Sequence, residues 1–63
     1  MPSSKDILKR LKDAGWYVRA TKGDHVHLKH PEKPGKVTVP DPVKDIDVTL
    51  LKKIEKQAGM KLR

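Results

Sequence analysis

The chain has 63 residues, no cysteine and a formal net charge of +7, which predicts one small domain without disulfide bonds or thiolate metal ligands. Only 35% of the residues are apolar and there is no Phe; a domain this small buries about 60% of its unfolded surface and often depends on a partner or on self-association. No apolar run approaches the ~20 residues of a membrane span, and the N-terminus leads into no signal-peptide core. A cytoplasmic protein without a membrane partner is therefore expected.

The positive charge is spread along the chain. Residues 1–15, 16–40 and 41–63 carry net charges of +2, +3 and +2. This distribution favours a folded domain with basic surfaces over a disordered basic tail. Such surfaces attract the phosphodiester backbone of nucleic acids.

The first predicted element is a helix that ends at Gly15, a residue type common where helices stop. Ser3 or Ser4 is suited to cap its N-terminus, because a serine hydroxyl accepts a hydrogen bond from the first turn. Asp6 lies in that turn, where the helix dipole favours a carboxylate. The apolar side chains at helical spacing are Ile7, Leu8, Leu11 and Ala14.

Three short strands are predicted next, because apolar and polar residues alternate with a period of two. In the first turn Gly23 precedes Asp24, the reverse of the commonest hairpin order, so the turn type stays open. Pro40 and Pro42 end the third strand, since proline cannot donate to a ladder. The predicted strands are 16–21, 25–29 and 36–39, and the predicted turns between them are 22–24 and 31–35.

A final helix is predicted after the prolines, with Asp45 or Asp47 as its cap and Gly59 at its end. Its apolar stripe consists of Leu50, Leu51, Ile54 and Ala58. The predicted order is therefore αβββα in one domain over residues 1–63. The fold class is α+β, a three-stranded antiparallel sheet with two helices on one face.

Strand alternation predicts two different faces for this sheet. His30 has the opposite parity to the other histidines and precedes Pro31, so we expect it at a strand end or turn. The face under the helices is expected to carry Trp16, Val18, Val26, Leu28, Val37 and Val39. The open face is expected to carry Tyr17, Arg19, His25, His27, Lys29, Lys36 and Thr38.

The histidines of the open face point to proton transfer on RNA. Cleavage without a metal needs a base for the 2′-hydroxyl, an acid for the leaving 5′-oxygen and cations for the phosphoryl charge. His25 follows a glycine turn, where a phosphate can approach, and His27 lies two residues further on the same face. We expect these two histidines to be catalytic. The residues expected to bind RNA are Lys22, Gly23, Lys29, Lys36 and Arg19.

Plainer interpretations of the same residues stay open. Surface histidines and lysines are most often simply solvated, and a non-catalytic RNA-binding module fits the charge equally well. His25 and His27 also match the spacing of a metal site on a strand, but a third ligand is hard to place, so no metal or other cofactor is expected. On the final helix Thr49, Lys52 and Lys56 lie opposite the apolar stripe, and Lys53 flanks them. This surface is either an ordinary solvated helix face or one that binds backbone phosphates or an acidic protein partner.

Short motifs lie in a fixed order along nearly the whole chain. They are Gly15-Trp16, Lys22-Gly23-Asp24-His25, Lys29-His30-Pro31, Pro34-Gly35-Lys36-Val37-Thr38-Val39-Pro40, Lys44-Asp45-Ile46 and Lys56-Gln57-Ala58-Gly59. Together they resemble the HicA toxins of bacterial and archaeal HicA–HicB toxin–antitoxin pairs. Several motifs in the right order are far more specific than any one of them.

The resemblance implies a fold similar to a double-stranded-RNA-binding domain and the activity of an mRNA interferase, a small ribonuclease that cuts messages. The catalytic histidine that it implies is His25. Family members usually carry Ser where this chain has Asp24, and often His where it has Asp41. The implied partners are mRNA and a HicB-type antitoxin that covers the active site, in a homodimer or a toxin–antitoxin hetero-oligomer.

Overall fold

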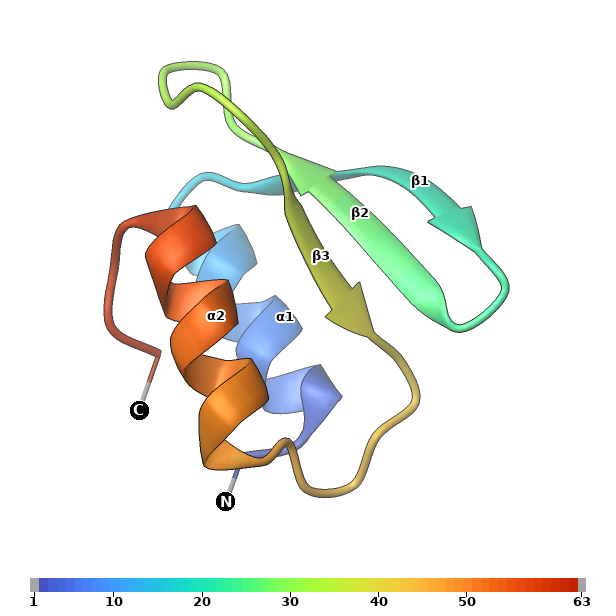
Figure 1. The fold of residues 1–63 in the computed structure, drawn as a ribbon. Coiled ribbons are helices and arrows are strands. Elements are labelled where there is room, and N and C mark those ends of the chain that lie inside the picture. The colour runs from blue at the N-terminus through green and yellow to red at the C-terminus, as the bar shows by residue number, and fades with distance from the viewer. Residues whose placement is uncertain (1, 63) are drawn as a thin grey trace.

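The computed structural model describes residues 2–62; Met1 and Arg63, the ends of the expected domain, lie outside the described residues. The three strands form one antiparallel sheet in the order β1-β2-β3, and both helices lie on the same side of it (Figure 1). The predicted αβββα arrangement is confirmed. No helix within residues 2–62 is long and apolar enough to cross a membrane. The elements are α1 (Ser4–Asp13), β1 (Tyr17–Lys22), β2 (His25–Lys29), β3 (Val37–Pro40) and α2 (Val48–Ala58).

Helix α1 begins with a reciprocal cap between Ser3 and Asp6. The Asp6 backbone N–H donates to the Ser3 hydroxyl at 3.2 Å, and the Ser3 backbone N–H donates to the Asp6 carboxylate at 3.3 Å. These bonds satisfy N–H groups that have no partner within the helix. Of the two predicted caps, Ser3 is therefore the one used.

Neutralising the Asp6 carboxylate should destabilise the domain in a pH-dependent way. Hydrogen bonds from the Ser3 backbone and hydroxyl, with the charges of Arg10 and Lys5, lower the pKa of Asp6 below its ordinary value of 3.8. Because the unfolded chain binds this proton more readily, the stabilisation is present above the ordinary pKa and is lost as the pH falls through the lowered one. We expect Asp6→Asn to lower the melting temperature by a few degrees at pH 7, and by less at an acidic pH well below 3.8.

Thermal denaturation of both proteins at the two pH values measures this difference. Asp13→Asn is the matched control, since Asp13 ends the same helix, where the dipole disfavours a carboxylate. A loss of stability for Asp6→Asn that persists unchanged at low pH would contradict the assignment.

Helix α2 is capped by Asp47, one of the two predicted residues. Its carboxylate accepts from the Leu50 backbone N–H at 2.8 Å. Gly59 ends the helix with a left-handed φ of 67°, as predicted, and its N–H donates to the Glu55 carbonyl. Both helix boundaries thus follow from local capping chemistry.

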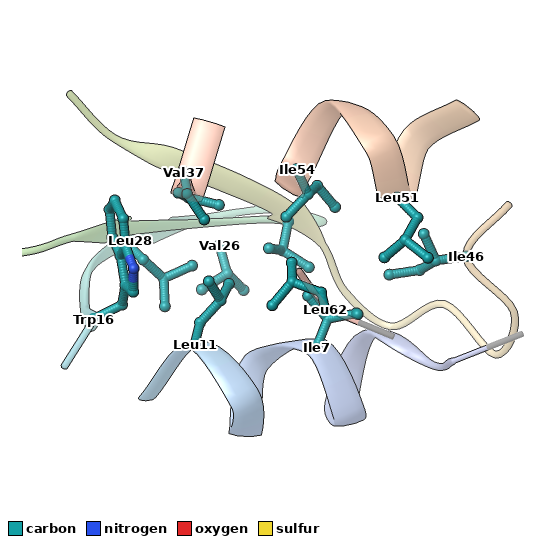
Figure 2. Close-up of a cluster of buried hydrophobic side chains, with 12 residues drawn as sticks. Ile7, Leu11, Trp16, Val26, Leu28, Val37, Ile46, Leu51, Ile54 and Leu62 are labelled. Atoms are coloured by element: carbon teal, nitrogen blue, oxygen red, sulfur yellow. The ribbon is translucent and has the colours of Figure 1, made fainter. Parts of the chain in front are cut away.

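The core lies between the sheet and the two helices (Figure 2). Trp16 packs at one end of the cluster beside Leu28, and Ile46 and Leu51 lie at the other end. Ile46 and Leu62 come from outside the helices and strands and are fully buried, which the periodicity did not predict. The buried set is Ile7, Leu11, Trp16, Val26, Leu28, Val37, Val39, Ile46, Leu51, Ile54, Ala58 and Leu62.

The prediction that β1 buries Val18 and Ala20 is wrong. The register shifts between them, so that Arg19 is an extra residue in β1 and Ala20 pairs with His27. Such a bulge reverses the alternation of side chains beyond it. Val18 still lies opposite Leu28 but is 42% exposed. The β1–β2 hairpin extends past the helices, which leaves every residue of β1 exposed (Figure 1).

A hydrogen-bond network joins the segment after β3 to the start of α1. The buried Ser4 hydroxyl donates to the Asp41 carboxylate at 2.6 Å and accepts from the Val43 backbone N–H at 3.0 Å. The Ser4 backbone N–H donates to the Val43 carbonyl. The side chain of Asp41 is thus held at α1.

Candidate functional site

The site is built around the turn that precedes His25. Gly23 has a φ of 54° and Asp24 has a negative φ, as in a type II′ turn, which takes glycine at its first central position. The two-residue turn places Lys22 directly opposite His25 on the neighbouring strand. The Asp24 carbonyl accepts from the Asp41 backbone N–H at 2.8 Å. The turn before His25 is therefore fixed by the pairing of β1 with β2 and by the hydrogen bond from Asp41, which follows β3.

The strand register defines the open face of the sheet. His25 is exposed, and the predicted partner Lys22 lies beside it at the end of β1. This face contains cations and histidines but no carboxylate, which suits it to a phosphate. Its residues are Tyr17, Ala20, Lys22, His25, His27, Lys29, Thr38 and Pro40.

His27 lies on the same face and is half-buried. Its Nδ1 atom is 3.1 Å from the Thr38 hydroxyl, directly across on β3. Alternate residues of one strand lie roughly 6.5–7 Å apart, a spacing that allows two imidazoles to flank one phosphodiester group. The structure thus places both predicted catalytic histidines on one surface, with the His27 ring oriented by Thr38.

A groove opens beside His25, where the open face meets α2. Its volume is about 320 Å³. The sequence suggested Lys53 only as one alternative for the lysines of the final helix, and Gln57 was not predicted; the signal for both was their spacing from Leu50, at i+3 and i+7 on one helix face. The lining residues are His25, Thr38 and Pro40 from the sheet, and Leu50, Lys53 and Gln57 from α2.

The remaining predicted RNA-binding residues are less closely grouped. Lys29 is exposed at the far end of β2, opposite Tyr17. Lys36 precedes β3 and is exposed, but it lies outside the paired strands. Arg19 is the bulge residue and has no place in the register, so the alternation that put it on the open face does not hold there. Lys22 is the predicted cation that the register brings to His25.

The third histidine has a structural role, as its parity indicated. The Nδ1 atom of His30 accepts from the backbone N–H groups of Glu32 and Lys33, at 3.0 and 3.2 Å. Its Nε2 atom lies 3.0 Å from the Ala14 carbonyl, which fixes Nε2 as the donor. The ring packs edge-on against Trp16, with centroids 5.3 Å apart. His30 therefore joins the loop after β2 to the end of α1.

Two further observations concern other sites. Among residues 2–62, no group of three or more His, Asp or Glu side chains is placed to hold a metal ion.

A second hollow of about 630 Å³ runs along α1. Its lining mixes lysines with Asp6, Asp13 and Asp41 and contains no histidine. Within residues 2–62, the open face next to α2 combines imidazoles with cations that no carboxylate of that face opposes.

The fold and this surface define a small αβββα domain with a basic, histidine-bearing sheet face. The family model described as the HicA toxin of bacterial toxin–antitoxin systems matches residues 4–60, and the chain belongs to this family. A solved structure described as the HicA3 and HicB3 toxin–antitoxin complex is similar, with 42% identity and a TM-score of 0.85 over 97% of this chain and 98% of that chain. A comparison with curated proteins found no match.

Proposed function

We propose that this protein is the toxin of a toxin–antitoxin pair and acts as a metal-independent endoribonuclease on mRNA. The observation that carries the proposal is the position of His25, exposed on a face without carboxylates and directly opposite Lys22. Membership of the HicA toxin family supports the same assignment.

The proposed reaction is attack of a 2′-hydroxyl on the adjacent phosphorus. One histidine takes the proton of the 2′-hydroxyl as the new P–O bond forms, and the other gives a proton to the leaving 5′-oxygen. His25 fills one of these roles and His27 the other. Lys22, directly opposite His25, stabilises the charge that develops on the phosphoryl oxygens, and Lys29 at the far end of β2 binds a phosphate further along the RNA, because cations on this face meet no competing carboxylate.

The proposed protein partner is a HicB-type antitoxin. The structure described as a HicA3–HicB3 complex contains a chain 42% identical to this one over almost its whole length. A net charge of +7 favours an acidic partner surface. An antitoxin that covers the open face would block access to His25.

Incubating the purified protein with a defined single-stranded RNA and a chelator tests the activity. We expect cleavage that survives chelation and gives a 2′,3′-cyclic phosphate on one fragment and a 5′-hydroxyl on the other, because the 2′-oxygen is the nucleophile. Loss of cleavage on chelation would contradict the metal-independent mechanism. Salt-sensitive binding with no cleavage would instead identify a non-catalytic RNA-binding module.

A further inference from the structure

We propose that α2 supplies the second half of the RNA site. Lys53 binds a phosphate of the substrate, and Gln57 contacts the base of the nucleotide next to the scissile phosphate. This inference rests on the proposed function, since it assumes that RNA is cleaved at His25. The inference gives a binding role to Lys53 and Gln57, which neither cap α2 nor belong to its buried core.

The groove is continuous with the proposed catalytic surface, because His25 itself forms part of its wall. A phosphate held at His25 therefore has its neighbouring nucleotide at the groove. The volume of about 320 Å³ is at the lower limit for small-molecule pockets, which suits a ligand no larger than one nucleotide. Pro40 and Leu50, both half-buried, offer apolar surface to the face of a base.

The orientation of the Gln57 amide follows from its partner. Its Oε1 atom accepts from the Thr38 backbone N–H at 3.3 Å, on the outer edge of β3. A backbone N–H can only donate, so the oxygen is the atom turned to the sheet and the Nε2 amino group is left to donate elsewhere. A donor held in this way selects a base that presents an acceptor on its edge.

The charge of the groove favours a phosphate. Lys53 lies one helical turn before Gln57, on the same side of α2, and is exposed. None of the residues that line the groove is acidic. Lys52 is the next residue along the helix and is also exposed, but it does not line the groove. The two lysines therefore form a matched pair that differs in position and not in charge.

The first test measures binding of an RNA oligonucleotide with a 2′-deoxynucleotide at the cut site, which removes the nucleophile. Fluorescence anisotropy over a series of salt concentrations gives the affinity and its salt dependence. We expect Lys53→Ala to weaken binding about 10-fold and to reduce the salt slope by about 0.7, as for one lost phosphate contact on a single strand. Lys52→Ala should change the affinity less than about 2-fold, because Lys52 does not line the groove and salt screens the charge of an exposed side chain that makes no phosphate contact. Equal effects of the two variants would overturn the role of Lys53.

The second test sequences the cut sites in a randomised RNA pool. Gln57→Glu retains an acceptor for the Thr38 N–H but replaces the amide donor, so we expect a changed base preference at one position next to the cut. Unchanged cut sites would overturn the role of Gln57. If Lys53→Ala weakens only the binding of the antitoxin, the groove is a protein contact and the inference is wrong. If wild type does not cleave RNA, the proposed function fails; the comparison of Lys53→Ala with Lys52→Ala in binding an all-RNA oligonucleotide then still judges the phosphate contact of Lys53.

Discussion

Replacing His25 with alanine should lower the rate of RNA cleavage at least about 100-fold, because a positioned general acid or base contributes about 10²–10⁴-fold. Expression of wild type in a bacterial host should arrest growth, and expression of His25→Ala should not. Cleavage of a defined RNA in single-turnover assays, together with growth curves after induction, measures both effects. The imidazole is exposed at the start of β2, so its removal takes away no core contact.

The variant must still be folded and able to bind RNA for this result to concern catalysis. We expect the melting temperature of His25→Ala to match that of wild type, and its salt-dependent RNA binding to remain, because Lys22 and Lys29 are unchanged. A His25→Ala protein that cleaves RNA as fast as wild type would refute the assignment. His27→Ala, measured in the same assay, tests the second proton-transfer group.

Gly15→Ala should destabilise the domain by about 3 kcal/mol, from backbone strain together with the displaced His30 ring. Gly15 has a φ of 100°, and a Cβ there would lie 2.7 Å from the His30 Nε2 atom. The ring cannot retreat without losing its bonds to Ala14 and to the following loop. A domain of this size has a total stability of roughly 3–9 kcal/mol, so the variant should be close to unfolding. Chemical denaturation measures the change.

Gly35→Ala is the matched control for this prediction. Gly35 also has a positive φ, of 82°, but a Cβ there meets no atom within 4 Å. It should therefore lose only about 1–2 kcal/mol from the left-handed backbone. In a His30→Ala background the cost of Gly15→Ala should fall toward that of the control, since the clash is gone. Equal losses for the two glycine variants, or strict additivity with His30→Ala, would contradict the packing argument.

The helices and their boundaries were predictable because capping and amphipathic periodicity are local properties. Ser3, Asp47 and Gly59 act at the helix ends as their residue types indicate. The separation of His30 from the other histidines also followed from strand parity. The hydrogen bond of Gln57 could not be predicted from local patterns, because its partner Thr38 lies on the outer edge of β3, 19 residues away in the chain.

By itself, the sequence determined the order αβββα, the family resemblance and a basic sheet face that carries His25 after a glycine turn. These properties depend on residue type and spacing within a few positions. The tertiary structure alone decided that Lys53 lies at the groove beside His25, that β1 bulges at Arg19, and that His30 packs on Trp16. Strand register and helix docking join residues far apart in the chain, and no local pattern specifies which of them meet.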